Sequence, residues 1–561
     1  MKSIFKYTAL VAGLALLCVS CKNQLNIPPV GSLSSEGYFS TPVHIEEGIR
    51  GAYTKIRAAE IVEYPYLSES RSDNVWTDPA PNATRDATEI GHYRFNSSLG
   101  ALKSVWSGWY NVIYNTNNVL ANLDNVEFTK DAVKNQFRGE LLFLRAYAHF
   151  ELARVFGNVP IVDHVLTVSE AKELKQSAAA EVISTRVIPD LKEAISLLPY
   201  QKEMLSSSGS SATAEYRGDK LAAQAMLARV YMTLYGWPYN DKSVKGEAKS
   251  LLKSVIDYAT ANGYWAPDAT EWKKMFTPDR VAQNKYFIFS IQHTGSTTNS
   301  MAFYSCAAAL SVEYLPTQQG NSFYNGNGMY TGFVEAATRY EFQQTGDERG
   351  TFCILDTMDP IGSFQGYSNR ETDFTLEGGD VVTAYERSLN TKWVPYESKR
   401  ETIGVNFDDQ TLSNTTNNDA GGWPMNFPIL RTEDMMLLYA ELLAEDGDVA
   451  GAMELVNKLR TRAGVEARPT DCSAADALNF VKKERKLEFF GEGIRWFDEI
   501  RYGEWKDATV KMFNRYINSS NPGYKTTVST SNIADGMYLC PIPESEMLNV
   551  PGLYVQNKDW N

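Results

Sequence analysis

Four stretches of the chain place an apolar side chain at every third or fourth position, which is the spacing of an amphipathic helix. The clearest stretch is 137–162, where Gly157 and Pro160 predict the end of the helix. Residues 218–238 repeat the same design. The apolar stripe of the first helix consists of Phe137, Leu141, Leu144, Ala148, Leu152 and Val155.

The other two helical stretches lie near the C-terminus. Residues 432–464 read as a helix, a turn at Gly447-Asp448 and a second helix. Residues 476–505 read as a long helix that is broken around Gly491–Gly493 and then resumes. Helix pairs with small residues at close crossings, in units of roughly 34 residues, indicate tetratricopeptide-like repeats. We therefore expect a mostly helical protein.

Three further stretches lack helical periodicity. Residues 204–214 are rich in Ser and predict a flexible surface loop. Residues 290–335 and 365–428 are rich in Gly, Asn, Ser, Thr and aromatic residues. Loops of that length in a compact protein are usually functional or disordered, and the aromatic residues favour a functional role for 290–335.

The N-terminus resembles a bacterial lipoprotein signal. Lys2 and Lys6 precede an apolar run that is too short to span a bilayer comfortably, and the run ends at Ser20-Cys21. We expect residues 1–20 to be a signal peptide and Cys21 to carry acyl chains, two of which anchor a protein stably. An ordinary secretion signal with incidental cysteines remains the alternative.

Charge and cysteine content exclude several classes of function. The formal charge of −14 becomes −16 once Lys2 and Lys6 are removed, which argues against nucleic acid as a partner. The cysteines beyond the signal and its Cys21 are far apart and form no CxxC pair, so zinc binding and thioredoxin-like chemistry are not expected, and spacing cannot assign disulfides. Four cysteines remain beyond the signal: Cys306, Cys353, Cys472 and Cys540.

The sequence contains none of the catalytic signatures that we sought. There is no HExxH, GxSxG or Walker A sequence, and the glycines of 326–332 have the wrong spacing for a dinucleotide site. The five histidines never fall at metal-ligand spacing, and His149, inside a helix beside Phe150, is expected to pack in the core. We expect no catalytic residue, no metal and no cofactor. An acid pair for glycoside hydrolysis is a tertiary arrangement that sequence does not reveal.

Six segments, in this order along the chain, carry a family resemblance: 25–56, 106–126, 137–162, "FPILRTEDMMLLYAELLAEDGD", "ERKLEFFGEGIRWFDEIRYGEW" and "LCPIPESEMLNVPGLYVQNKDW". With these segments the chain resembles the SusD/RagB family of Bacteroidetes outer-membrane nutrient-uptake lipoproteins over nearly its whole length. It departs from members exported to the cell surface in one respect, because Lys22 to Ser35 contains no acidic residue.

This resemblance implies a SusD-like fold in which four tetratricopeptide-like units form a scaffold and an irregular half packs against it. We expect residues 21–561 to form one unit, with helical repeats mainly in 100–260 and 430–505 and loop-rich ligand-side segments mainly in 60–100 and 265–428. Such proteins sit as a lid on a SusC-like TonB-dependent transporter, capture oligosaccharide and have no catalytic activity. The implied location is the outer membrane, lipid-anchored and facing the cell exterior.

A glycan site needs aromatic rings for the CH faces of sugars and planar polar groups for their hydroxyls. Trp76 lies in a polar, turn-rich segment with Arg85 close behind, so we consider it either a sugar platform or a buried packing residue. Tyr304, Tyr324 and Tyr330 are interleaved with asparagines and are the second group of predicted glycan contacts. The helix-borne tryptophans Trp106, Trp109 and Trp496 are expected in the core.

Other functions remain open at this level. Some family members take up peptides or host-glycoprotein sugars instead of polysaccharide. A secreted helical glycoside hydrolase and a pure protein-binding scaffold are alternatives from different classes. Turnover of a chromogenic substrate would identify the hydrolase, and buried loop aromatics without sugar binding would identify the scaffold.

Overall fold

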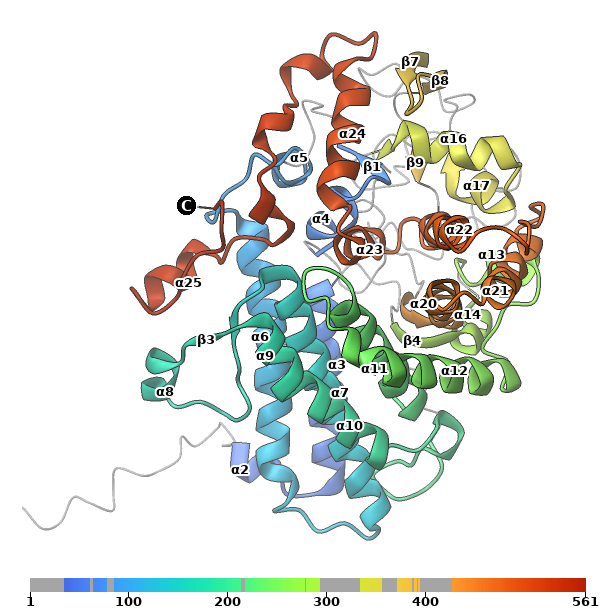
Figure 1. Ribbon diagram of the computed structural model, residues 1–561. Helices are drawn as coiled ribbons and strands as arrows, with labels where there is room; N and C mark the ends of the chain where they lie inside the picture. Colours follow the sequence, from blue (N-terminus) through green and yellow to red (C-terminus); the bar gives the residue numbers. More distant parts are fainter. Residues whose placement is uncertain are drawn as a thin grey trace, which may run out of the picture.

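The computed structural model of the protein describes residues 35–60, 64–77, 85–212, 217–277, 279–292, 333–355, 371–385, 388–390, 392–393 and 426–560. The described part is mostly helical, as expected, and its long helices stack one on the next (Figure 1). In the order of packing, these helices are α3 (Pro42–Glu60), α6 (Gly100–Leu123), α7 (Asp131–Phe156), α10 (Ile188–Leu197), α11 (Lys220–Tyr235), α12 (Lys245–Ala261), α20 (Thr432–Glu445), α21 (Val449–Arg462) and α22 (Ala474–Glu488).

Helix α7 is more deeply buried than its amphipathic stripe predicts. Its polar side chains are buried with their partners: Arg145 donates to both carboxylate oxygens of Asp190 at 2.8 and 2.9 Å. Glu140 pairs in the same way with Arg217. The reason is position, because α7 contacts α3, α6 and α10, and these neighbours bury nearly all of it from Gly139 to Phe156. Buried charges are tolerated where each one is paired.

The turns predicted near the C-terminus are confirmed. Gly447 has a φ of +83°, in the left-handed region that favours glycine, between α20 and α21. Gly491 and Gly493, at +74° and +73°, separate α22 from α23 (Arg495–Tyr502). The chain then continues into α24 (Trp505–Ile517).

Short antiparallel strand pairs join distant parts of the chain. β1 (Val75–Trp76) pairs with β5 (Phe333–Val334), and the amide of Val334 donates to the carbonyl of Ser388 beside β9 (Leu389–Asn390). The segments 60–100 and 265–428 are therefore bound to one another where they leave the helical scaffold. The other pairs are β2 (Val159–Pro160) with β3 (Gln176–Ser177), β4 (Phe287–Ile291) with β10 (Phe427–Arg431), β6 (Ile354–Leu355) with β9, and β7 (Glu371–Thr375) with β8 (Val381–Tyr385).

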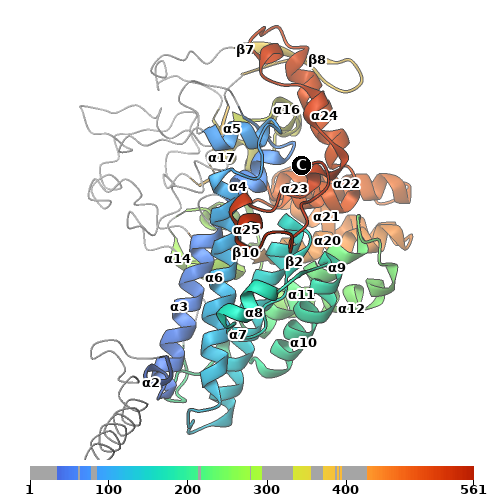
Figure 2. The same cartoon turned by 90° about the vertical axis from the view of Figure 1, so that its left-hand side faces the viewer.

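Shorter helices lie around this frame, several of them near the strands in the upper part of Figures 1 and 2. They are α2 (Ser35–Tyr38), α4 (Tyr64–Leu67), α5 (Arg85–Gly91), α8 (Val168–Glu173), α9 (Ala179–Val182), α13 (Ala269–Lys274), α14 (Arg280–Tyr286), α16 (Ala336–Thr345), α17 (Glu348–Cys353) and α25 (Glu544–Asn549).

The Ser-rich loop lies on the surface, as predicted, with Ser208, Ser210 and Ser211 exposed, and it is also hydrogen-bonded to α7. Within its described part, 204–212, Met204 is buried and Leu205 bridges to Ser211. Gln136 on α7 exchanges two hydrogen bonds with the backbone of Leu205, and Lys130 donates to the carbonyl of Gly209 at 2.7 Å. Composition does not reveal such tertiary hydrogen bonds, which hold this loop against the end of α7.

Candidate functional site

Trp76 lies in the core, which corrects its prediction as a sugar platform. Only 1% of the residue is exposed, and its ring stacks on Tyr516 of α24 with a centroid distance of 3.7 Å and an interplanar angle of 5°. The pairing of β1 with β5 brings it inside, although its sequence neighbours are polar. Of the two predictions for Trp76, the structure agrees with that of a buried packing residue. Trp106, Trp109 and Trp496 are buried, as expected.

The other predicted site residues are not described in the structure. Arg85 is the first residue of α5, but its side chain lies outside the described part. Tyr304, Tyr324 and Tyr330 lie outside the described residues, and so does Cys21. These assignments stay predictions.

Buried ion pairs connect the loop-rich segments to the scaffold. Asp73, three residues before Trp76, accepts two hydrogen bonds from Arg495 at 2.8 and 3.0 Å and pairs with Lys486 at 3.2 Å. Burial alone would raise the pKa of Asp73, but Arg495 and Lys486 hold that pKa well below its usual value. Asp73 therefore stays charged and links the segment just before β1 to α22 and α23.

Glu69 makes a second connection at the break between α22 and α23. Its carboxylate accepts hydrogen bonds from the backbone amides of Gly491 and Gly493 at 3.0 and 2.9 Å. Asn74 donates to the same carboxylate at 3.1 Å. Gly491 and Gly493 both have a positive φ, which favours glycine, and in this conformation their backbone amides point at the carboxylate.

A larger group of ion pairs, the Glu488 hub, joins α17, α20, α21, α22 and β10. Five cations meet five carboxylates in it, and no side chain of the group is more than 5% exposed. Glu488 is central because three arginines contact its carboxylate. The hub consists of Arg349, Lys392, Arg431, Arg460, Arg462, Asp347, Glu433, Glu484, Glu488 and Glu492.

One concave site, the α3–β4 cleft, adjoins the predicted ligand-side segment directly. Its cavity volume, between α3 and β4, is about 290 Å³. Gln292, the last described residue before 333, lies at its edge, where its side chain accepts from Asn426 at 2.9 Å. The lining residues are Arg50, Tyr53, Thr54, Ile56, Arg57, Phe289, Ser290, Ile291 and Gln292.

The α3–β4 cleft offers planar polar groups and aromatic edges. The Arg50 side chain is 58% exposed, with Glu46 3.4 Å away. The Tyr53 hydroxyl donates to Glu140 and accepts from the amide of Gly218, so this residue presents its ring rather than its hydroxyl. Guanidinium and amide groups beside aromatic carbon are the chemistry that sugars require.

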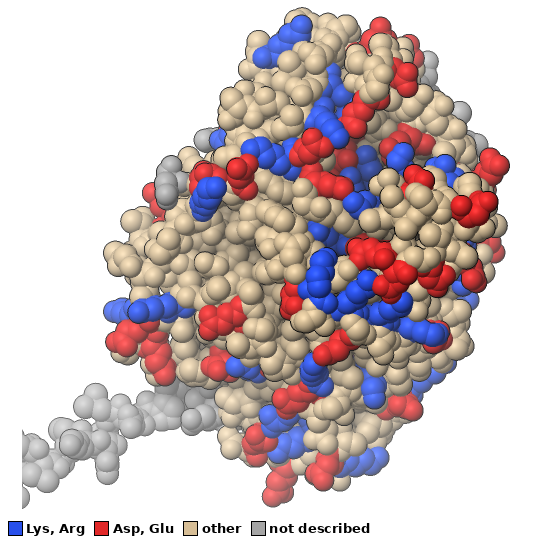
Figure 3. Space-filling view, viewed as in Figure 1, with Lys and Arg blue, Asp and Glu red and all other residues tan. Residues whose placement is uncertain are grey.

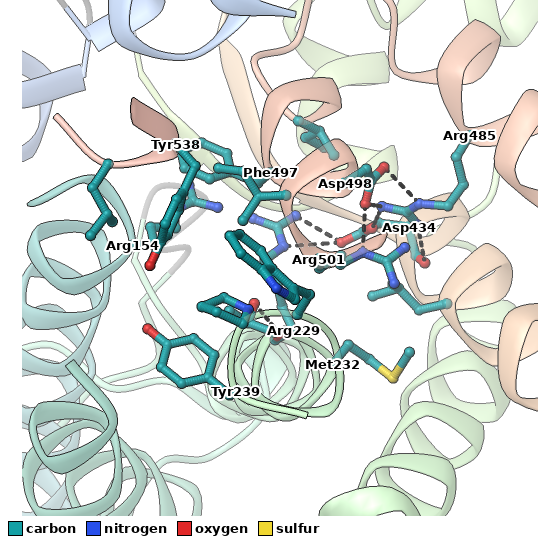
Figure 4. Close-up of a pocket in the computed structure, with 17 residues that line it drawn as sticks. Arg154, Arg229, Met232, Tyr239, Asp434, Arg485, Phe497, Asp498, Arg501 and Tyr538 are labelled. Atoms are coloured by element: carbon teal, nitrogen blue, oxygen red, sulfur yellow. Dashed lines mark hydrogen bonds and ion pairs between the residues drawn. The ribbon is translucent and has the colours of Figure 1, made fainter. Parts of the chain in front are cut away.

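A second concave site, the Trp237 pocket, lies where α7, α11, α20, α22 and α23 meet Tyr538 and Leu539 (Figure 4). Its cavity volume is about 50 Å³. Aromatic side chains form much of its wall, and Arg154 stacks over the ring of Phe497 with 3.7 Å between Cζ and the ring centroid. The aromatic lining residues are Trp237, Tyr239, Phe497 and Tyr538, and the charged ones are Arg154, Arg229, Asp434, Arg485, Asp498 and Arg501.

The charges of the Trp237 pocket neutralise one another. Arg229 and Arg485 both pair with Asp434, whose pKa falls to about 2 because the two arginines outweigh the effect of burial. Arg501 pairs with Asp498 and Glu441. Arg154 pairs with Glu151 on its own helix. Four arginines therefore face four carboxylates, and the pocket carries no unbalanced charge.

Sequence reasoning missed this pocket, although part of its signal was visible. The run "YGWPYN" (235–240) closes α11 and places Trp237 and Tyr239 in a turn. We interpreted it only as a helix end. Tyr538 comes from a segment about three hundred residues away, and its ring centroid lies 4.6 Å from that of Trp237. The contact between Trp237 and Tyr538 therefore exists only in the folded chain, and the local sequence does not reveal it.

Metal and membrane-spanning features are absent from the described ranges. No group of three or more His, Cys, Asp or Glu side chains there could hold a metal ion. His149 is a core histidine, as predicted, and burial lowers its pKa to about 4. No helix among the described residues is long and apolar enough to cross a membrane. On the face shown in Figure 3, basic and acidic side chains are interspersed, without a broad basic area.

Comparison with known proteins gives the family. The model of the SusD family matches residues 272–560, more than half of the chain. The chain belongs to the SusD family. A second, SusD-like family model matches residues 31–232, and that family is described as starch-binding and associating with the outer membrane.

Individual relatives agree with the SusD assignment. The chain is 24% identical over 498 residues to a SusD-like protein of Formosa agariphila, covering 86% of this chain and 88% of the relative. A SusD homolog from Bacteroides thetaiotaomicron is 20% identical with a TM-score of 0.71, covering 94% of this chain and 98% of that one. A surface glycan-binding protein from the same species, solved with laminarihexaose, is 18% identical with a TM-score of 0.66, covering 92% and 100%. These likenesses establish the SusD fold.

Proposed function

We propose that this SusD-family protein is a glycan-binding lipoprotein of the outer membrane. It captures oligosaccharide at the cell exterior and passes it to a SusC-like TonB-dependent transporter, without breaking glycosidic bonds itself. The observation that carries the proposal is the match of two family models to the two halves of the chain, one of them described as starch-binding and associating with the outer membrane. The solved relative that holds laminarihexaose supports the same ligand class.

The α3–β4 cleft is the described part of the proposed glycan face. Arg50 and Gln292 supply planar donors at its edges, and Phe289 and Tyr53 supply aromatic surface. The predicted tyrosines belong to residues 293–332, which follow Gln292 in sequence. Tyr304, Tyr324 and Tyr330 remain the proposed stacking residues, with Arg85 as a proposed polar contact. Trp76 has no part in this site because it is buried.

Affinity electrophoresis tests the proposal. The chain from Lys22 onward is run through gels that contain laminarin, starch or other polysaccharides, and product release is assayed in parallel. We expect one glycan to retard the protein without any product. Release of product would replace the proposal with a hydrolase. If no glycan retarded the protein, peptide cargo or a protein scaffold would be favoured.

Two variants assign the glycan face. The triple variant with Tyr304, Tyr324 and Tyr330 changed to Ala should lose retardation by the glycan that binds wild type. Tyr114→Ala is the matched control, because Tyr114 is 54% exposed on α6 and outside the α3–β4 cleft. Equal loss in both variants, or no loss in the triple variant, would contradict the assignment of these tyrosines.

The anchor and the transporter are tested separately. Cells that express the full chain should incorporate a radiolabelled fatty acid into the protein, and Cys21→Ser should abolish the label. The lipidated protein should co-purify with a TonB-dependent barrel after crosslinking of intact cells. Label retained in Cys21→Ser would refute the lipid anchor, and absence of any barrel would refute the hand-off.

A further inference from the structure

The α3–β4 cleft differs in charge from the chain as a whole. Its nine described lining residues include two arginines, Arg50 and Arg57, and no carboxylate, whereas the whole chain has a formal charge of −14. The Trp237 pocket is different, because its arginines pair with carboxylates and its cavity volume is only about 50 Å³. The charge of the α3–β4 cleft therefore bears on the class of glycan that it accepts.

Both arginines lie on one face of α3. Arg50, Thr54 and Arg57 follow one another at spacings of four and three residues, which places their side chains in one row along the helix. Two turns of helix separate the arginines by about 10 Å. The opposite wall is β4, which contributes Phe289 and Gln292 with its end. A chain of sugar units along this row would meet a guanidinium group at two points.

Arg50 can exchange its present partner for a ligand. Its side chain is 58% exposed and lies 3.4 Å from Oε1 of Glu46. The same oxygen accepts from the buried Arg217 at 3.2 Å, and the other oxygen of Glu46 accepts from the amide of Ser207 at 3.1 Å. Exposed ion pairs contribute little to stability. Arg50 can therefore turn towards an anion in the cleft while Glu46 keeps its two other partners.

Arg57 lies further along the same row and is partly buried. This burial lowers the pKa of Arg57, because it disfavours the charged form. An anion beside Arg57 would oppose that effect and stabilise the guanidinium. The planar guanidinium group of arginine also matches oxyanions in shape, since it donates two parallel hydrogen bonds to them.

The polar groups of the cleft favour a ligand that accepts hydrogen bonds. Guanidinium groups only donate. The Tyr53 hydroxyl already both donates and accepts, and the amide oxygen of Gln292 already accepts from Asn426. The Thr54 hydroxyl donates to the carbonyl of Arg50 at 3.0 Å. The hydroxyls of a neutral sugar need acceptors as well as donors, whereas ionised acidic groups only accept.

We propose that the α3–β4 cleft binds an acidic oligosaccharide, with Arg50 and Arg57 paired to carboxylate or sulfate groups on its sugars. The Tyr53 ring then remains for the CH face of a sugar unit. The cavity volume of about 290 Å³ is at the lower end of small-molecule sites, which are about 300–1,000 Å³, so it suits a short segment of a longer chain. This inference rests on the proposed function, because it specifies the class of glycan taken up at the same site.

Isothermal titration calorimetry on the chain from Lys22 onward tests the ligand class with matched pairs of probes. One pair is an oligogalacturonate and its methyl ester, and the other is a sulfated galactan oligosaccharide and its desulfated form. Laminarin and starch oligosaccharides are further neutral probes. We expect one acidic probe to bind at least about tenfold more tightly than its neutral partner, since hydrogen bonds to charged groups are the stronger ones. The pair that shows the difference identifies the acidic group as carboxylate or sulfate.

The inference and the proposed function fail in distinguishable ways. If a neutral probe bound as tightly as every acidic one or more tightly, the inference would be wrong and the glycan-binding function would stand. If no probe bound, the proposed function would fail, and the inference that rests on it would fail too.

Single arginine variants test the site. Arg50→Gln and Arg57→Gln should each weaken binding of the acidic probe about tenfold and reduce its dependence on salt, because each variant removes one charge contact. Arg50→Lys should keep the salt dependence. Arg138→Gln is the matched control, because Arg138 pairs with Asp124 on the surface of α7, outside the cleft.

Arg50→Gln is the decisive variant, since its exposed side chain can be changed without disturbing the core, and an unchanged circular dichroism spectrum checks the fold. Wild-type affinity and salt dependence in Arg50→Gln and in Arg57→Gln would overturn the inference. An equal loss of affinity in Arg138→Gln would overturn it as well, because the effect would then be one of overall charge.

Discussion

Replacing Glu488 with glutamine removes one charge from the centre of the Glu488 hub and keeps the shape of the side chain. Its carboxylate accepts hydrogen bonds from Arg349 at 2.8 Å, Arg431 at 3.0 Å and Arg462 at 2.7 Å. The indole of Trp272 donates to it at 3.1 Å. The change therefore affects four side chains that belong to four different elements, while it leaves the volume of the core unchanged.

The size of the effect follows from the balance of charge. In the wild type five cations face five carboxylates, and after Glu488→Gln five cations face four. Burial alone would raise the pKa of Glu488, but Arg462, Arg431 and Arg349 lower it, so its charge is retained in the fold. Removing one partner from a buried ion pair costs about 3–5 kcal/mol, a large part of the 5–15 kcal/mol typical of a folded protein.

Urea denaturation followed by circular dichroism measures the change in unfolding free energy. Asp257→Asn is the matched control, because Asp257 pairs with Lys253 in an exposed i,i+4 pair in which both side chains are about 60% exposed. Such surface pairs contribute roughly 0–1 kcal/mol. If Glu488→Gln lost no more stability than Asp257→Asn, the Glu488 hub would not hold the loop-rich half to the scaffold, and our reasoning would be refuted.

Three further predictions concern single residues. Burial lowers the pKa of His149 to about 4 from 6.5, so its neutral ring stabilises the fold above pH 6.5 and this contribution, at most about 3 kcal/mol, is lost as pH falls towards 4. His149→Gln should flatten the stability profile over that range, and an unchanged profile would contradict the assignment. Trp76→Ala should lower the unfolding free energy by about 3–5 kcal/mol without changing glycan affinity, and the reverse result would return Trp76 to the binding site. Gly491→Ala should destabilise by about 1–3 kcal/mol in the same urea assay, because φ is +74° and a Cβ would lie 2.5 Å from Asn390; wild-type stability would refute this.

Much of the helical half was predictable because its signals are local. Apolar side chains at helical spacing predicted α7, α11, α20 and α22, and glycines marked the turns at Gly447 and at Gly491–Gly493. The core position of His149 was also predictable, since it lies inside a helix beside Phe150 and no other histidine falls at metal-ligand spacing from it. Segment order sufficed for the family as well, and both family models agree with it.

Contacts between distant segments decided the rest. Trp76 sits among polar neighbours in sequence, yet β5, more than two hundred residues later, pairs with its strand and closes it into the core. Arg145 reads as a polar-face residue of an amphipathic helix but pairs with Asp190 inside the protein. Neither partner is visible from local periodicity.

The sequence by itself determined the helices, their turns and the family, because helix formation depends on neighbours three and four positions away. Only the tertiary structure decided which aromatic rings and which charges are buried. Trp237 and Tyr538 line one pocket, and Glu488 meets Arg349 and Arg431, only because the folded chain brings segments far apart in sequence to within a few ångströms. Burial and ion pairing depend on that proximity, and spacing along the chain does not encode it.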